Sequence, residues 1–228
     1  MVKISAGSYD LNKWLHGGYE CEVVSVIYGG PGTGKTNFCM LAAVSQAKKG
    51  NKVIYIDTEG GFSVERVKQL APEQVNDVLK NILLLNPLNF DEQKEVFKKL
   101  AHYLKDEISL IVVDGMTMLY RLDMANAREK EQNNVQAVNS ELASQMRTLA
   151  EIARKRTIPV IITNQVYKWD DEQKMVGGDI LQYWGKCLIE LSNEKGKRTA
   201  LLKKHRNLPE STLDFQIVHE GVKKKGWL

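Results

Sequence analysis

A run of glycines that ends in a lysine and a threonine, residues 29–36, has the spacing of a phosphate-binding loop. It fits the pattern G-x-x-x-x-G-K-[ST] and lies between an apolar stretch at 23–27, typical of a strand, and a helical pattern from Lys35. The glycines let successive N–H groups converge on a phosphate, and the helix start adds its positive dipole end. A glycine-rich turn with a coincidental lysine is the alternative, which the strand and the helix disfavour. The residues assigned to nucleoside triphosphate binding are Gly29, Gly30, Pro31, Gly32, Thr33, Gly34, Lys35, Thr36 and Asn37.

Three polar side chains, Glu59, Asp114 and Gln165, stand at or just after the ends of further apolar runs of the parallel-strand type. The carboxyl ends of parallel strands meet at the ligand-binding edge of an open sheet, so these side chains are expected beside the loop. There we expect Lys35 to reach the β- and γ-phosphates, and Thr36 and Asp114 to hold Mg²⁺ and its water shell. Glu59 would activate water and Gln165 would sense the γ-phosphate. For Glu59 alone, a solvated acidic turn explains the stretch equally well.

Two basic positions are less specific. Arg66, in a helical pattern that begins at Ser63, could stack on an adenine, although a solvated surface arginine is the commoner outcome. A basic series follows a strand-like run near the end of the chain and could bind DNA phosphates, contact the ATP of a neighbouring subunit, or simply be a solvated strand end. The members of this series taken as candidates are Lys203, Lys204, His205 and Arg206.

The elements that must position these residues alternate between strand and helix patterns. They predict an α/β fold with a mostly parallel central sheet, flanking helices and a C-terminal antiparallel extension. The charged stretch 121–134 is expected to be a long mobile loop, and 166–178 a short one. Helices are expected from about Ser8 and Ser63 and at 35–49, 91–104 and 135–152, with buried strands at 53–56, 82–85, 110–113 and 158–163 and a meander at 187–191, 198–203 and 213–218.

Composition sets broad limits on the class of protein. The chain has 228 residues, 43% of them hydrophobic, with no Pro/Gly/Ser-rich linker, which indicates a single domain spanning 1–228. Its three cysteines are far apart and form no metal-binding or disulfide pattern, so a reducing cytoplasm is expected. No signal sequence and no apolar run of ~20 residues is present, so no membrane association is expected. The net charge of +4 permits an acidic partner without requiring one.

The order of the motifs resembles the RecA/RadA recombinase superfamily, in which the sensor glutamine heads the second DNA-binding loop. The resemblance covers nearly the whole chain, and within the superfamily it is strongest to the archaeal RadB family of RadA paralogues. It implies ATP and Mg²⁺ as cofactors, Glu59 as the water-activating glutamate, Asp114 as the metal-associated aspartate, Gln165 as the γ-phosphate sensor and Arg66 as the arginine beside adenine. The segments that carry the resemblance are 4–18, 29–36, 55–60, 110–114, 163–166, 176–178 and 204–210.

Two departures from the recombinase pattern shape the expected function. No helix-hairpin-helix domain or polymerisation segment is expected before the phosphate loop, and the second DNA loop is short, with acidic residues at 170–172 beside Tyr167 and Trp169. We therefore expect a DNA repair and recombination protein that binds single-stranded or branched DNA and assists the main recombinase RadA. Weak, DNA-independent ATP hydrolysis is expected, without strand exchange. Junction-processing enzymes are further candidate partners, and a homodimer or higher oligomer is considered.

Two other functional classes remain open at this stage. A DNA-dependent strand-exchange ATPase would show DNA-stimulated hydrolysis and filaments. A signalling ATPase of the KaiC-like group shares the order of the loops and a Lys-x-Arg finger similar to residues 204–206, and it would not act on DNA.

Overall fold

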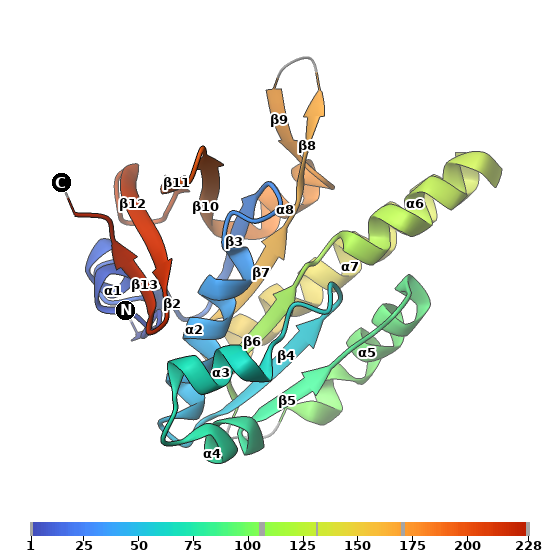
Figure 1. Ribbon diagram of the computed structural model, residues 1–228. Helices are drawn as coiled ribbons and strands as arrows, with labels where there is room; N and C mark the ends of the chain where they lie inside the picture. The colour runs from blue at the N-terminus through green and yellow to red at the C-terminus, as the bar shows by residue number, and fades with distance from the viewer. Residues whose placement is uncertain (1, 105–107, 131, 170–171, 227–228) are drawn as a thin grey trace.

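A nine-stranded sheet forms the centre of the protein, in the order β13-β12-β11-β10-β3-β7-β6-β4-β5 (Figure 1). The computed structural model describes residues 2–104, 108–130, 132–169 and 172–226. From β10 to β5 neighbouring strands are parallel, and from β10 to β13 they are antiparallel, which confirms the fold class expected from the sequence. The strands are β3 (Val24–Gly29), β4 (Lys52–Asp57), β5 (Ile82–Leu85), β6 (Ile108–Asp114), β7 (Val160–Asn164), β10 (Gly185–Glu194), β11 (Lys197–Lys204), β12 (Ser211–Val218) and β13 (Gly221–Lys224).

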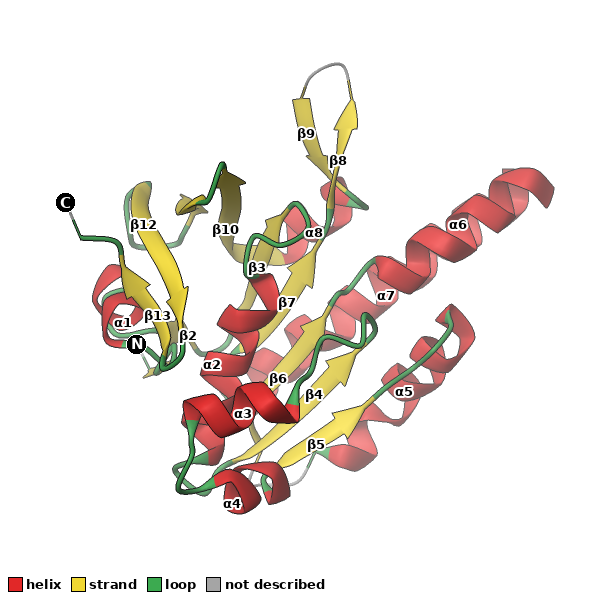
Figure 2. Cartoon of the chain, viewed as in Figure 1, coloured by secondary structure: helices red, strands yellow, loops and turns green. Residues whose placement is uncertain are grey.

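Helices cover both faces of the sheet (Figure 2). Each face has its own hydrophobic cluster. This arrangement follows from the parallel strands, whose crossover connections must pass over one face or the other. On one side lie α1 (Tyr9–Trp14), α2 (Lys35–Ala47), α3 (Val64–Leu70) and α4 (Val75–Lys80); on the other lie α5 (Phe90–Tyr103), α6 (Met118–Lys130), α7 (Gln132–Arg156) and α8 (Gly178–Trp184). In the described ranges, no helix is both long enough and apolar enough to cross a membrane.

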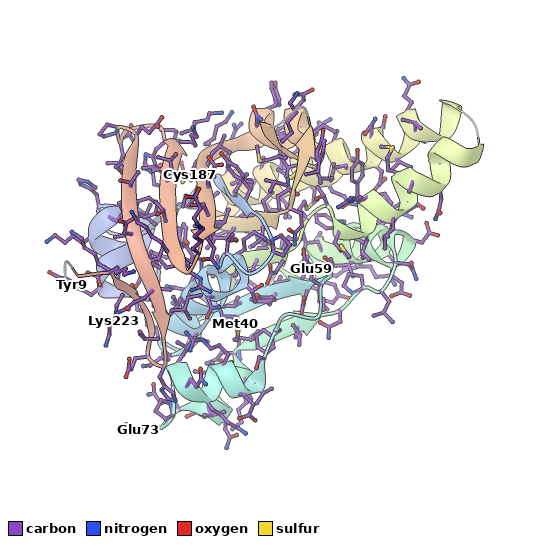
Figure 3. The ribbon with its side chains drawn as sticks, turned by 45° about the horizontal axis from the view of Figure 1, so that its top comes forward. Tyr9, Met40, Glu59, Glu73, Cys187 and Lys223 are labelled. Carbon is purple, nitrogen blue, oxygen red and sulfur yellow. The ribbon has the colours of Figure 1, made fainter. Side chains whose placement is uncertain are left out.

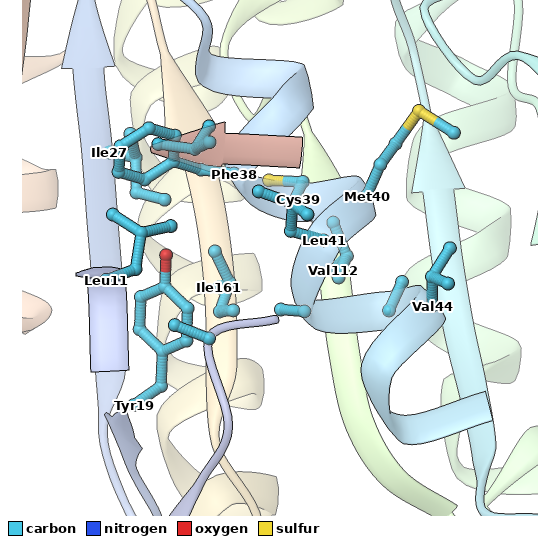
Figure 4. Close-up of a cluster of buried hydrophobic side chains, with 14 of the residues drawn as sticks. Leu11, Tyr19, Ile27, Phe38, Cys39, Met40, Leu41, Val44, Val112 and Ile161 are labelled. Carbon is cyan, nitrogen blue, oxygen red and sulfur yellow. The ribbon is translucent and has the colours of Figure 1, made fainter. Parts of the chain in front are cut away.

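Helix α2, which follows the phosphate loop, is buried on nearly every side (Figure 4). Phe38 and Leu41 are almost fully covered, and the Phe38 ring meets the edge of Phe215 in β12 at a centroid distance of 5.2 Å. The short sheet of β1 (Lys3–Ile4) and β2 (Tyr19–Glu20) lies on the same side as α2, and residues of the C-terminal strands pack in the same cluster. The loop is therefore held by a helix that the rest of the domain fixes in place.

The structure confirms two predicted helix starts and the strand at 82–85, but the predicted burial of that strand is wrong. Ser8 and Ser63 cap α1 and α3 by accepting backbone N–H bonds, as their position before apolar patterns indicated. The strand expected at 82–85 is present, but it is the edge strand β5 and is not buried: Leu83 is 40% exposed and Leu84 36%. An apolar run alone cannot distinguish a central strand from an edge strand.

Two predicted loops are wrong. Residues 121–134 are not a long mobile loop, because α6 continues through Lys130 and α7 begins at Gln132. Met124 and Ala127 are buried on one side of α6, and this narrow apolar face was hidden among charged residues. The loop expected at 166–178 is a hairpin of β8 (Val166–Trp169) and β9 (Glu172–Met175) that stands away from the sheet in Figure 1, followed by α8. The acidic Asp170 and Asp171 lie outside the described residues.

Candidate nucleotide site

The phosphate loop leaves the carboxyl end of β3 and enters α2 at Lys35, beside the ends of β4, β6 and β7. A cavity of about 370 Å³ lies over it. The sequence predicted this cluster at the sheet edge, and the structure brings Lys35, Glu59 and Gln165 together in one cavity wall. The residues that line the cavity are Pro31, Gly32, Gly34, Lys35, Thr36, Asn37, Glu59, Gln165, Arg198 and Ile217.

Two glycines of the loop are required by close packing. Gly34 has a φ of +112°, and a Cβ there would lie 3.2 Å from Cδ1 of Ile217. A Cβ at Gly29 would lie 2.1 Å from the carbonyl oxygen of Leu191 in β10. A larger residue at Gly29 would force the loop away from β10, and at Gly34 the left-handed φ itself disfavours a side chain. The loop is thus shaped by β10 and β12 as well as by its own glycines.

The Lys35 side chain is buried and folds back over the loop. Its ammonium donates to the carbonyl oxygens of Gly29 and Gly30, each at 2.9 Å, and to Oε1 of Gln165 at 3.3 Å. Burial lowers the pKa of Lys35, while the charges of Glu59 and Asp114 act in the opposite direction. These contacts hold a positive charge at the centre of the site, where an anion would be bound.

Glu59 lies in the loop after β4 (Figure 3), and Gln165 directly follows β7. Nε2 of Gln165 donates to both carboxylate oxygens of Glu59, at 3.2 and 3.3 Å. Burial raises the pKa of Glu59 above that of an ordinary glutamate, and the hydrogen bond from Gln165 partly offsets this. A carboxylate with a raised pKa in a cavity wall is a candidate general base.

Asp57 holds the backbone of the Glu59 loop, a role that the sequence analysis did not assign. Its carboxylate accepts hydrogen bonds from the backbone N–H groups of Glu59, Gly61 and Phe62, at 3.1, 3.2 and 2.9 Å. Asp57 is buried at the end of β4. The signal was present in the sequence, since an aspartate directly before a glycine-rich turn commonly accepts N–H bonds from that turn.

Asp114 ends β6 as a buried carboxylate with neutral donors around it. Thr163 donates to Oδ1 at 2.6 Å and Tyr55 donates to Oδ2 at 2.9 Å. Burial raises the pKa of Asp114, whereas the hydrogen bonds from Thr163, Thr36 and Tyr55 lower it. The described residues contain no group of three acidic, histidine or cysteine side chains suited to a metal. The pair Thr36 and Asp114 fits Mg²⁺, which retains several waters and takes few protein ligands.

The end of β7 connects this site to the β8–β9 hairpin. The backbone oxygen of Gln165 accepts from the N–H of Val176 at 3.1 Å, and Nδ2 of Asn164 donates to the carbonyl of Val176 at 2.9 Å. Thr117, at the start of α6, also donates to Asn164. The backbone of Gln165 and the side chain of its neighbour Asn164 thus fix the base of the hairpin. A movement of the Gln165 side chain can therefore affect the hairpin.

Arg66 and the basic turn do not join the cavity wall. Arg66 donates to Gln69 and to the carbonyl oxygens of His219 and Gly221, at 2.6, 3.0 and 3.4 Å, so its guanidinium fastens α3 to the turn between β12 and β13. Burial lowers the pKa of Arg66.

Sequence reasoning missed Arg198 and Ile217, which enter the cavity only because β11 and β12 pair alongside β10.

The basic turn lies toward the amino end of β3, away from the phosphate loop. Lys204 donates to the carbonyl oxygens of Gln182 and Gly185, both at 3.0 Å, at the end of α8. Arg206 donates to the buried Glu20, and Nδ1 of His205 accepts backbone N–H bonds from the turn itself. Lys203 is exposed. Three of the four candidate basic residues are thus engaged in contacts within the chain.

Comparison with known proteins agrees with this geometry. Residues 1–225 match the Rad51 family. The chain is 40% identical to the DNA repair and recombination protein RadB of Methanocaldococcus jannaschii, with 93% of this chain and 98% of that protein covered. It is 41% identical to RadB of Methanobrevibacter smithii, covering 93% and 92%. The chain belongs to the RadB group of the Rad51 family.

A solved RadB structure shows the same architecture. The crystal structure of the RadB recombinase aligns with a TM-score of 0.81 and 32% identity, covering 98% of this chain and 100% of that one. The expected resemblance to RadB and the RecA-like fold are both confirmed. The glycine-rich loop, the strand-end carboxylates and the C-terminal meander described above are therefore parts of a RadB-type core.

Proposed function

We propose that this chain is an ATP- and Mg²⁺-binding protein of DNA repair and recombination, with residues 1–228 acting as one RecA-like ATPase core. It binds single-stranded or branched DNA and serves as an accessory or regulator of the main recombinase, RadA. The observation that supports this best is the contact chain Lys35–Gln165–Glu59 over the phosphate loop, which connects directly to the hairpin base at Val176.

Each residue of the site has a distinct proposed task. The backbone of 29–34 and the ammonium of Lys35 bind the phosphates, and bound ATP with Mg²⁺ would supply the transferable phosphoryl group and neutralise its charge. Thr36 and Asp114 hold the metal ion and its waters. Glu59 removes a proton from the attacking water, and its raised pKa suits that task. Because its carboxylate is held by Gln165, we expect hydrolysis to be slow. We further propose that hydrolysis does not depend on DNA.

Gln165 is the proposed switch between nucleotide and DNA. The side-chain amide of Gln165 accepts a hydrogen bond from Lys35 and donates one to Glu59. A bound phosphate would compete for the two donors, Nζ of Lys35 and Nε2 of Gln165. When the side chain turns to the phosphate, the Gln165–Val176 backbone bond and the adjoining Asn164 contact carry the change to the hairpin. The hairpin side chain Tyr167, 39% exposed, is available to stack on a base.

The DNA contacts at the basic turn are proposed for Lys203 first, because Lys204 and Arg206 already bind other parts of the chain. Placement of Lys204 and Arg206 against a neighbouring subunit's ATP, in a homodimer or higher oligomer, requires that they first leave these contacts. RadA and junction-processing enzymes remain proposed partners. An adenine contact from Arg66 likewise requires release of the β12–β13 turn.

The test combines hydrolysis and DNA affinity. ATP hydrolysis is measured with and without single-stranded DNA, and fluorescence anisotropy of labelled single-stranded and branched DNA is measured with no nucleotide, with ADP and with a non-hydrolysable ATP analogue, at a stated salt concentration. We expect slow hydrolysis, no stimulation, and DNA affinity that differs between ADP and the analogue. Gln165→Ala should still bind ATP but lose that difference. Strong stimulation by DNA would instead indicate a recombinase motor, and absence of DNA binding would contradict the proposal.

A further inference from the structure

Gly115, the buried residue that directly follows Asp114, leaves a space that the side chain of Glu59 fills. A Cβ at position 115 would overlap with Oε1 of Glu59 and lie 3.3 Å from its Cδ. The φ angle of Gly115 is outside the left-handed region, so the backbone conformation itself accepts other residues. The position of the Glu59 carboxylate, rather than the backbone, therefore requires a glycine here.

The backbone on both sides of this contact is fixed. The hydroxyl of Thr58 donates to the carbonyl oxygen of Gly115 at 2.6 Å and accepts from its N–H at 3.1 Å. The N–H of Thr58 donates to the carbonyl oxygen of Asp114 at 2.8 Å, and the N–H of Glu59 donates to the carboxylate of Asp57 at 3.1 Å. A methyl group at position 115 would therefore displace the Glu59 carboxylate, which is the flexible part, and not the two loops.

The present position of Glu59 is a held one. Nε2 of Gln165 donates to both carboxylate oxygens, and a carboxylate that already accepts from an amide donor is a weaker acceptor for a proton of water. Glu59 is otherwise exposed and lies in the wall of the nucleotide cavity, so a displaced carboxylate would move into that cavity. We propose that Gly115 is a positioning residue, which lets Glu59 rest against Gln165 and so keeps hydrolysis slow. This inference rests on the proposed role of Glu59 as the base.

The first test is steady-state ATP hydrolysis with Mg²⁺ and without DNA. Gly115→Ala should raise kcat about twofold to tenfold, the effect of one net hydrogen bond lost from the carboxylate, and leave KM for ATP unchanged. The double variant Glu59→Gln, Gly115→Ala should show no rise, because the group that moves is then not a base. Gly226→Ala is the control for an added methyl group, since a Cβ there meets nothing within 4 Å, and it should hydrolyse ATP like the wild type.

The second test measures thermal unfolding by circular dichroism and needs no nucleotide. Gly115→Ala is compared in the wild-type chain and in the Glu59→Ala background. Without the Glu59 carboxylate the methyl group has room, and alanine restricts the unfolded chain more than glycine does, so Gly115→Ala should raise Tm. In the wild-type chain the same change breaks the contact between Glu59 and Gln165, and its effect on Tm should be less favourable.

The outcomes separate this inference from the proposed function. An unchanged or lower kcat in Gly115→Ala overturns the inference, as does an equal change of Tm in the two backgrounds. If Gly115→Ala does not fold, the double variant Glu59→Ala, Gly115→Ala must still fold, and an unfolded double variant overturns the inference. In each of these cases the wild type still binds ATP and the proposed function stands. A wild type that binds no ATP would overturn the proposed function, while the comparison of Tm values still tests the shared space.

Discussion

Arg206 is expected to stabilise the fold, although its place in the basic series 203–206 suggested an exposed side chain that could bind DNA. Its Nε and Nη2 atoms donate to Oε2 of Glu20 at 3.3 and 3.2 Å. Glu20 is only 4% exposed, and Asn207, Lys3 and His205 also approach it. Removing the arginine takes charge-assisted bonds from a carboxylate that water cannot reach.

The size of the effect can be worked from the exposure of the two partners. Hydrogen bonds to charged groups contribute about 1.5–3 kcal/mol each when buried. The Arg206 side chain is 37% exposed, so solvent screens its charge, and the discounted loss for Arg206→Ala is about 1–2 kcal/mol. For a domain of this size, that loss lowers Tm by about 2–8 °C.

Thermal unfolding followed by circular dichroism measures this directly, with Lys203→Ala as the exposed control from the same turn. We expect Arg206→Ala to have a lower Tm than the wild type and Lys203→Ala to have the same Tm as the wild type. Lys203→Ala should instead weaken DNA binding. The double variant Glu20→Gln, Arg206→Met should recover part of the loss, because a neutral amide then replaces the buried carboxylate that Arg206→Ala leaves without the arginine. If Arg206→Ala melts with the wild type and only DNA affinity falls, the structural reasoning is refuted.

Three further predictions concern the nucleotide site. Lys35→Ala should remove ATP binding in calorimetry, and unchanged affinity would refute the assignment of the phosphate loop. Because the proposed base Glu59 would act only when ionised and burial raises its pKa, the rate of hydrolysis should fall with decreasing pH at a higher pH than an ordinary glutamate would impose. Glu59→Gln should abolish turnover, and an unchanged pH–rate profile in that variant would exclude Glu59. Tyr55→Phe removes the donor to Oδ2 of Asp114 and should lower the free energy of unfolding by about 1–2 kcal/mol at neutral pH. The loss should shrink in acid, where Asp114 is protonated, and equal losses at both pH values would show that the hydroxyl does not act through the charge.

The sequence predicted the parts of the site that lie at strand ends. Lys35, Glu59, Asp114 and Gln165 each follow a short apolar run, and parallel strands place such positions at one edge whatever the order of the strands. The fold class followed from the same alternation. The fold class and the placement of these residues could be predicted because they depend on local pattern and on one general rule of sheet topology; their roles stay predictions.

The remaining features depended on contacts distant in sequence. Arg198 and Ile217 reach the cavity through the pairing of β11 and β12 beside β10, and no local pattern marks either residue. Arg206 donates to Glu20, which lies near the opposite end of the sequence. The residues next to Arg206 are basic and give no sign of this partner, so the sequence suggested an exposed basic surface. Among the described side chains of α6, Leu119, Tyr120, Met124 and Ala127 are buried, and the charged residues around the last two conceal this apolar face in the sequence.

The pairing of β3 also constrains how the protein is made. This strand, which carries the phosphate loop, has β7 (Val160–Asn164) and β10 (Gly185–Glu194) as its two neighbours. During synthesis from the N-terminus, β3 therefore emerges long before either strand that flanks it. A nascent chain can assemble β4, β5 and their helices first, but the loop acquires its supports only once most of the chain has left the ribosome. A nucleotide bound at the proposed site would then stabilise only a nearly complete chain, and would not rescue a product of translation that stops early.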